Sequence, residues 1–342
     1  MMRYRLLGSS GLRVSELAYG VMNFGTEAWG TPDADACAGL YRAFRDAGGN
    51  FIDTSNEIYA AGRSERFLGK LIEGHRDEVV VGTKYSFAQP GTRDANIAGN
   101  HRKSMMRSVE SSLARLGTDF IDVLWVHGWD TLTPVDEMMR GLDDLVSQGK
   151  VQYIGISNAP AWLVAQANTM AELRGWSRFV GLQIEYNLLE RDAEHDLLPM
   201  AKALGLGVLA YSPLASGILS GKYNAAAGDA PRRLDVNTFM ASADERSLGV
   251  AAAVIALAGR LQRPASQVAL NWLRAQPGVV PIIGARTLAQ LKDNLACLDF
   301  ALTAEQVAAL SEASVRRTPY PHNFIGRTRF ISNGGFYDKI DR

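Results

Sequence analysis

The feature that most constrains the fold is a regular alternation of short apolar runs with longer stretches of helical periodicity. Buried parallel strands read as continuous apolar runs, whereas helices repeat their apolar positions every three or four residues. In segment 101–117, Met105, Val109, Leu113 and Leu116 share one helical face, and a glycine ends the segment. The eight strand candidates are residues 17–21, 51–53, 79–84, 120–127, 152–157, 180–186, 207–212 and 279–285. Eight such units predict an α/β fold of the (β/α)8 TIM-barrel type, with an open doubly wound sheet as the alternative.

Two irregularities refine this prediction. Residues 4–16 alternate around a glycine-containing turn, which predicts a small N-terminal β-hairpin that caps one mouth of the barrel. The interval between the ends of the last two strands, from 212 to 285, is longer than the others. It contains a glycine-rich loop at 214–233 and two helical stretches, of which 264–275 is the clearer. We therefore expect an insert with extra helices before the last strand.

The C-terminal segment is treated as an extension of a single barrel domain. No break in composition marks a second domain, so residues 1–342 are predicted to form one domain with 316–342 as its extension. From Pro319 onward this segment is too aromatic for a free tail. Its aromatic residues are Tyr320, Phe324, Phe330, Phe336 and Tyr337. Closure over a substrate and docking on a neighbouring subunit, as in a homo-oligomer, are equally compatible with this pattern.

Composition excludes several classes of function. The 342 residues are 47% hydrophobic and carry a formal net charge of zero, so no strong field attracts nucleic acid. No leader pattern and no apolar run long enough for a membrane span is present, which favours a soluble, cytoplasmic protein. Cys37 and Cys297 are expected to be reduced core thiols. The five histidines show no metal-binding spacing, so no metal site is predicted.

Polar side chains gather where the predicted strands end. In a barrel of this type, chemistry takes place at the C-terminal ends of the strands. The polar residues at those ends are Asp53, Lys84, His127, Ser157, Asn158, Gln183, Tyr211 and Ser212. Each alone has an ordinary structural role available, such as a cap, a solvated tip or a hydrogen-bonded core histidine. An acid, a lysine and a histidine that converge on one mouth with a nearby tyrosine favour a proton-transfer site.

The tyrosine of that group is Tyr59, in the loop after the second strand. A free phenol has a pKa of about 10, which makes it a poor proton donor at neutral pH. A buried ammonium group from Lys84 would stabilise the phenolate, and Asp53 would keep that ammonium charged and oriented. His127 would then position a carbonyl oxygen. The four residues therefore predict a site that protonates an oxygen while hydride arrives at the adjoining carbon.

From about residue 3 to about residue 312 the chain resembles the aldo-keto reductase superfamily. The matching segments are "FIDTSNEIYAAGRSERFLG", "VVVGTK", "SLARLGTDFIDVLWVH", "GKVQYIGISN", "LQIEYNLLER", "AYSPLASGILSGKY" and "PIIGARTLAQLKDNL". The resemblance implies an NADP(H)-dependent oxidoreductase with Asp53, Tyr59, Lys84 and His127 as its catalytic tetrad. One departure is the spacing, since Tyr59 follows Asp53 by six positions where the family usually has five. We place the extra residue within "SNEI", as a bulge that leaves both functional residues in place.

The same resemblance implies the residues that bind NADP(H). Ser157, Asn158 and Gln183 would hold the nicotinamide carboxamide, and Tyr211 would stack on the nicotinamide ring. The loop after Tyr211 would surround the pyrophosphate, and Arg286 would hold the adenosine end. The full set implied is Gly20, Met22, Asp53, Ser157, Asn158, Gln183, Tyr211, Ser212, Leu214, Gly217, Lys222, Gly284, Arg286, Gln290 and Asn294.

The substrate is expected to be an aromatic or alicyclic carbonyl compound or the corresponding alcohol. Apolar side chains at the mouth favour this class, although each also has an ordinary core or surface role available. They are Val21, Met22, Trp29, Tyr85, Phe87 and Trp129, and Tyr59 and His127 complete the substrate site. Two other readings stay open: an NADP(H)-binding regulatory subunit on the same fold, and an aldolase-type barrel that uses Lys84 as a Schiff base.

Overall fold

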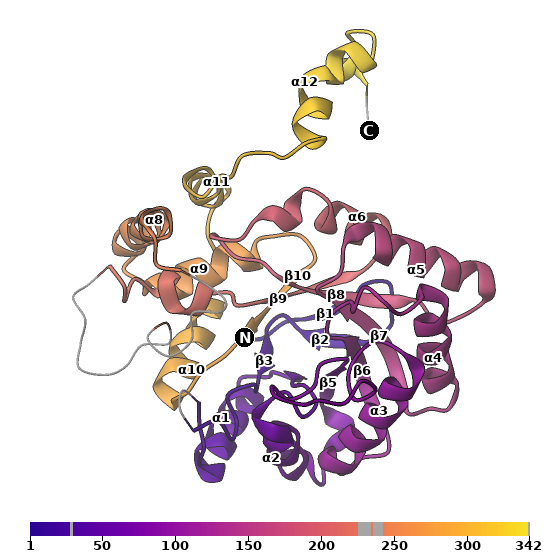
Figure 1. Ribbon diagram of the computed structural model, residues 1–342. Helices are drawn as coiled ribbons and strands as arrows, with labels where there is room; N and C mark the ends of the chain where they lie inside the picture. Colours follow the sequence, from indigo (N-terminus) through magenta and orange to yellow (C-terminus); the bar gives the residue numbers. More distant parts are fainter. Residues whose placement is uncertain (28–29, 225–233, 235–241, 341–342) are drawn as a thin grey trace.

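Eight parallel strands close into a barrel in the computed structural model, which describes residues 1–27, 30–224, 234 and 242–340 (Figure 1). The strands are β3 (Ala18–Gly20), β4 (Phe51–Asp53), β5 (Val80–Tyr85), β6 (Ile121–Val126), β7 (Val151–Ser157), β8 (Phe179–Glu185), β9 (Gly207–Tyr211) and β10 (Val279–Ile283). Strand β10 pairs with both β9 and β3, which closes the barrel. The predicted TIM barrel is confirmed, and the open-sheet alternative is wrong.

Helices surround the barrel on its outside (Figure 1). They are α1 (Ala34–Asp46), α2 (Arg63–Ile72), α3 (Arg102–Leu116), α4 (Val135–Ser147), α5 (Ala161–Arg174), α6 (Leu197–Ala203), α8 (Glu245–Leu261), α9 (Ala265–Arg274), α10 (Leu288–Leu295) and α11 (Ala304–Ala313). A further helix, α12 (His322–Ser332), follows them in the chain. The helix predicted at 101–117 is α3, which buries the expected apolar face and ends at Gly117 with a left-handed φ of 64°.

The N-terminal hairpin closes the end of the barrel opposite the C-terminal ends of its strands. Strands β1 (Tyr4–Leu6) and β2 (Arg13–Ser15) pair antiparallel, as predicted. Their connecting turn lies against the beginning of β9, where the backbone N–H of Ser9 donates to the carbonyl of Gly205 at 2.7 Å. A Cβ on Gly8 would lie 2.4 Å from the carbonyl oxygen of Val180, so the turn approaches the barrel as closely as a glycine allows.

The predicted extra helices before the last strand are present as α8 and α9. Of the predicted glycine-rich loop, residues 225–233 lie outside the described part of the chain. At the C-terminus, α12 extends away from the barrel and buries none of its residues (Figure 1). In the described ranges, every helix is too short or too polar to cross a membrane.

Side chains alternate between the two faces of the barrel wall, as the period of a strand requires. Along β5, Val80 and Lys84 point into the barrel, whereas Val81 and Tyr85 pack against the helices. Thr83 also points outward and donates a hydrogen bond to a side chain of α2. In a barrel of parallel strands, the C-terminal ends of all strands meet at one mouth. The residues that point inward at those ends therefore form a single site.

The barrel interior below that site is filled by Trp125 of β6. Its side chain is fully buried, and three inward glycines on β5, β7 and β8 make room for the indole ring. A Cβ on Gly155 would lie 2.2 Å from the ring, and Cβ atoms on Gly82 and Gly181 would lie 2.8 Å and 2.7 Å from it. Trp125 therefore forms the floor of the site, one layer below His127.

Candidate active site

Asp53 and Lys84 form a buried ion pair at the ends of β4 and β5. Lys84 Nζ lies 2.5 Å from Asp53 Oδ2 and 2.6 Å from the carbonyl oxygen of Thr54. The side chains of Lys84 and Asp53 are only 1% and 6% exposed. Burial lowers the pKa of Lys84, and the adjacent carboxylate of Asp53 opposes that effect. The lysine is held by two oxygens, so the Schiff-base alternative, which needs an unpaired lysine, gains no support.

Gln183 of β8 completes the surroundings of the Asp53 carboxylate. Its Nε2 donates a 2.9 Å hydrogen bond to Asp53 Oδ1, while Lys84 occupies Oδ2. A buried charge is tolerated only where it is paired and hydrogen-bonded, and both oxygens of this carboxylate satisfy that condition. The pair is thus rigidly oriented.

Tyr59 lies in the loop after β4, beside both Lys84 and His127. Lys84 Nζ is 5.3 Å from the centroid of the Tyr59 ring. The rings of Tyr59 and His127 have centroids 6.0 Å apart and are perpendicular. The spacing of six positions from Asp53 therefore still brings the tyrosine to the same mouth as the ion pair. All four residues of the predicted tetrad meet there.

His127 follows β6 and is largely enclosed. Its Nδ1 lies 3.2 Å from the hydroxyl oxygen of Ser55, and its ring centroid lies 4.4 Å from that of Phe87. Burial lowers the pKa of His127 well below its usual range, and the nearby charge of Lys84 lowers it further. The imidazole is consequently neutral at neutral pH and offers one N–H donor and one acceptor nitrogen.

The residues predicted to hold a nicotinamide carboxamide lie on the next strands around the mouth. Asn158 adopts a left-handed φ of 50°, and its amide donates to the carbonyl of His127 at 2.8 Å. Tyr211 donates its hydroxyl proton to Asn158 Oδ1, also at 2.8 Å. Ser157 Oγ is buried and makes no hydrogen bond with any residue that the structure describes. A buried hydroxyl without a protein partner is suited to a ligand's polar group.

The backbone after β9 is turned in an unusual way. Left-handed φ values occur at Ser212, Ala215, Ser216 and Gly217, which include three non-glycine residues. Such conformations cost free energy and collect at ligand sites. A Cβ on Gly217 would lie 2.5 Å from Lys222 Nζ, so this ammonium group lies directly over the turn. The turned backbone and the ammonium group of Lys222 are suited to a phosphate group.

The helix α10 begins directly after the last strand. The hydroxyl of Thr287 caps this helix by accepting from the backbone N–H of Gln290 at 3.3 Å. Gln290 Oε1 in turn accepts from the backbone N–H of Arg286 at 2.9 Å, and Asn294 donates to the carbonyl of Gly284 at 3.0 Å. Arg286 is exposed at this helix N-terminus. Backbone N–H groups and a guanidinium together make an anion-binding surface.

Aromatic side chains line the outer part of the mouth. Phe87 is 40% exposed and lies over Gly128, where a Cβ would be only 2.7 Å from the Phe87 ring. The partly buried Trp129 makes an edge-on contact with Trp162, with centroids 5.4 Å apart. Trp162 itself was not predicted. This wall presents flat apolar surface next to His127.

Two of the predicted mouth residues do not line it. Tyr85 is fully buried, and its hydroxyl donates to the carbonyl of Asn100 at 3.5 Å. Because Lys84 points into the barrel, the next residue must point outward, so the prediction that Tyr85 lines the substrate site is wrong. Val21 is likewise fully buried. Trp29 lies outside the described residues. Gly20 is the last residue of β3, and Met22 lies two positions after it.

Several residues of the site were not predicted from the sequence. Thr54 and Ser55, directly after Asp53, contact Lys84 and His127. Glu185 faces Tyr211 across the β8–β9 pairing, and burial together with the nearby charge of Glu190 raises its pKa to about 7. Glu185 lies two positions after Gln183 on the same strand, so both side chains point to the same face. This spacing could have predicted that Glu185 belongs to the site.

Comparison with known proteins agrees with this geometry. The model of the Aldo/keto reductase family matches residues 16–315. The chain is 37% identical to the aldo-keto reductase ausK of Aspergillus calidoustus, covering 95% of this chain and 85% of that protein. It is 38% identical to the norsolorinic acid reductase stcV of Emericella nidulans, with 92% and 82% covered. It is 34% identical to an aryl-alcohol dehydrogenase (NADP+) of Phanerodontia chrysosporium, with 95% and 89% covered.

Proposed function

The chain belongs to the aldo-keto reductase family, a family of oxidoreductases, and from that premise we propose that it transfers hydride between NADP(H) and a carbonyl or alcohol carbon. The observation that carries the proposal is the buried Asp53–Lys84 pair beside Tyr59 and His127 at the mouth of the barrel. The reaction is described below in the direction of aldehyde or ketone reduction.

Tyr59 is the proposed proton donor. Each unit by which its pKa falls below about 10 corresponds to roughly 1.36 kcal/mol of preferential stabilisation of the phenolate. The ammonium of Lys84 lies beside the ring in a dry environment, where its charge acts strongly, and Asp53 holds it in place. The Tyr59 O–H bond breaks as the proton moves to the carbonyl oxygen, which leaves a phenolate next to Lys84.

His127 is the proposed orienting group for the substrate oxygen. Because burial keeps its imidazole neutral, it does not compete with Tyr59 as an acid. Its bond with Ser55 fixes the plane of the ring. A neutral ring N–H can then donate a hydrogen bond to the carbonyl oxygen and polarise it.

When bound, NADPH would supply the hydride that the carbonyl carbon accepts. The buried hydroxyl of Ser157, which has no hydrogen-bond partner among the described residues, fits with Asn158 a carboxamide that both donates and accepts hydrogen bonds. Tyr211 offers an aromatic face for stacking. The turned backbone from Ser212 to Gly217, with Lys222, fits a pyrophosphate.

The proposed substrate is an aromatic or alicyclic carbonyl compound or the matching alcohol. Phe87, Trp129 and Trp162 form a wall of aromatic rings that favours a flat apolar molecule. A relative at 36% identity from Pestalotiopsis microspora is named an aryl-alcohol dehydrogenase, which agrees with this class.

The direct test is a turnover screen. The purified protein is assayed with NADPH and a series of aromatic, alicyclic and short aliphatic aldehydes and ketones, and with NADP+ and the corresponding alcohols. We expect steady turnover, fastest for aromatic substrates. Tight NADPH binding without turnover of any compound would favour the regulatory-subunit alternative, and the absence of cofactor binding would overturn the proposal.

Arg286 is predicted to recognise the 2′-phosphate that distinguishes NADPH from NADH. Its guanidinium lies at the N-terminus of α10, where backbone N–H groups also favour a phosphate. A charge-assisted hydrogen bond contributes roughly 1.5 to 3 kcal/mol, so Arg286→Ala should weaken NADPH binding by about ten- to a hundred-fold. NADH lacks this phosphate and should bind almost as before. Dissociation constants for both cofactors, measured by fluorescence titration, check the prediction.

The control is Arg178→Ala. Arg178 is also exposed, but it precedes β8 at the opposite end of the barrel and pairs with Glu172. This variant should leave both dissociation constants unchanged. Equal losses for NADPH and NADH in Arg286→Ala would mean that Arg286 does not read the 2′-phosphate. A preference of the unmodified protein for NADH would overturn the choice of cofactor.

A further inference from the structure

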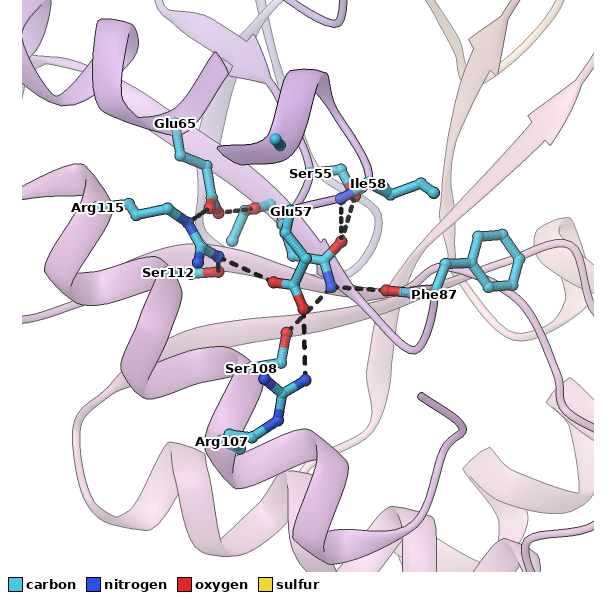
Figure 2. Close-up of polar contacts among 12 residues, drawn as sticks. Ser55, Glu57, Ile58, Glu65, Phe87, Arg107, Ser108, Ser112 and Arg115 are labelled. Carbon is cyan, nitrogen blue, oxygen red and sulfur yellow. Dashed lines mark hydrogen bonds and ion pairs between the residues drawn. The ribbon is translucent and has the colours of Figure 1, made fainter. Parts of the chain in front are cut away.

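A network of charged side chains from α2 and α3 holds the loop that precedes Tyr59 (Figure 2). This loop is one residue longer than the family usually has, and a longer connection has more conformations available. The function proposed for Tyr59 requires its hydroxyl to stay at one position. The network supplies contacts that restrict the loop, as the following distances indicate.

The inner end of the network is Glu65 on α2. It is fully buried and accepts hydrogen bonds from Thr83 Oγ1 at 2.7 Å and from Arg115 Nε at 2.5 Å. Thr83 precedes Lys84 on β5 but points out of the barrel. Arg115 belongs to α3, so Glu65 joins the strand of the catalytic lysine to two helices. Such a buried, paired charge gives a rigid anchor.

The outer end of the network is Glu57, within the stretch that holds the extra residue. Its two carboxylate oxygens face two arginines of α3: Arg115 Nη2 at 3.4 Å and Arg107 Nη2 at 3.3 Å. Arg107 also donates to the carbonyl of Ile97 at 2.8 Å. Figure 2 shows Glu57 between these two guanidinium groups, with Arg115 shared between Glu57 and Glu65. The loop is therefore held by ion pairs to Arg115, which Glu65 anchors, and to Arg107.

Asn56 connects this network to Tyr59. Its side-chain amide donates to the carbonyl of Phe87 at 2.9 Å and to Ser108 Oγ at 3.2 Å, and its Oδ1 accepts from the N–H of Ile58. The backbone N–H of Tyr59 donates to the carbonyl of Asn56 at 3.1 Å. Displacement of residues 56–58 would therefore move both Tyr59 and the carbonyl group of Phe87, a residue of the substrate wall.

We propose that Glu57 is a positioning residue, which fixes Tyr59 in reach of the substrate oxygen through its ion pairs with Arg115 and Arg107. The inference rests on the proposed role of Tyr59 as proton donor. A misplacement of about 1 Å can cost on the order of a hundred-fold in rate. The pair with Arg107 is partly exposed and by itself contributes little to stability, and Arg115 keeps its pair with Glu65 when Glu57 is removed. We therefore expect the main effect of removing Glu57 to fall on catalysis.

The test is a double-mutant cycle between Glu57 and Tyr59. Glu57→Ala should lower kcat for carbonyl reduction by about ten- to a hundred-fold, with KM and the NADPH dissociation constant changed by less than about threefold. In a Tyr59→Phe background, single-turnover measurements at high protein concentration should find no further loss from Glu57→Ala. Residues that act through one another give such non-additive effects. Glu57→Gln keeps the size of the side chain and one acceptor oxygen. Its kcat should lie between those of the unmodified protein and Glu57→Ala.

The matched control is Glu110→Ala, which removes the exposed ion pair of α3 with Lys150 and should leave kcat unchanged. If Glu57→Ala does not fold, Glu57→Gln is carried through the same cycle. An equal loss in both backgrounds, or no loss in either, overturns the positioning role while leaving the proposed function intact. Near-normal turnover of Tyr59→Phe alone would instead contradict the proposed role of Tyr59 as proton donor, on which this inference rests.

Discussion

A Tyr59→Phe variant is expected to reduce carbonyl substrates roughly 10²- to 10⁴-fold more slowly than the unmodified protein, because general acid catalysis contributes a factor of that size. The substitution removes only the hydroxyl group and leaves the ring beside Lys84 and His127. NADPH should therefore bind with almost unchanged affinity. Single-turnover rates of NADPH oxidation and a fluorescence titration of the cofactor measure the two quantities separately.

The control for this variant is Tyr4→Phe. Tyr4 belongs to the N-terminal hairpin, and its hydroxyl donates to the carbonyl of Gly48, far from the catalytic mouth. Loss of that exposed hydrogen bond should leave the rate unchanged. If Tyr59→Phe turned over at a near-normal rate, another group would have to supply the proton, and the assignment of Tyr59 would be wrong.

Lys84→Met is expected to be as slow as Tyr59→Phe, and it should also lower the thermal stability. The variant removes the ammonium group that favours the Tyr59 phenolate. It also leaves the buried carboxylate of Asp53 without its cation, and breaking a buried pair in this way typically costs about 3–5 kcal/mol. Turnover rates and thermal unfolding midpoints measured on the same preparations check both effects.

A double variant separates these two effects. In Asp53→Asn/Lys84→Met no unpaired charge remains, and the new amide can still accept the hydrogen bond from Gln183. We expect most of the lost stability to return while turnover stays low. Recovery of turnover together with stability would mean that Lys84 supports the fold alone and has no part in proton transfer.

The barrel and the meeting of Asp53, Tyr59, Lys84 and His127 at its mouth were predictable because both depend on local patterns. Apolar runs mark buried strands, and the last polar residue of each run marks the mouth of the barrel. The same rule of alternation also contradicts one prediction made from the sequence. Lys84 and Tyr85 are neighbours on one strand and cannot both face the interior, so the burial of Tyr85 was predictable from the assignment of Lys84.

The network around Glu65 was not predictable in this way. Glu65 and Arg115 are fifty residues apart, and their contact depends on how α2 and α3 pack against each other on the outside of the barrel. Neither periodicity nor composition encodes that packing. The same applies to Trp125, whose place in the centre of the barrel depends on glycines from three other strands. In both cases the contacts become apparent only when the packing of the strands and helices is known.

The filled interior of the barrel limits how molecules reach the tetrad. Trp125 occupies the space below Asp53 and His127, and the N-terminal hairpin covers the far end of the barrel. Within the part of the chain that the structure describes, the barrel axis therefore offers no route to Tyr59 and His127, which are reached from the mouth. In the proposed reaction, substrate would enter and product would leave past Phe87 and Trp129, so the two would compete for passage as well as for binding.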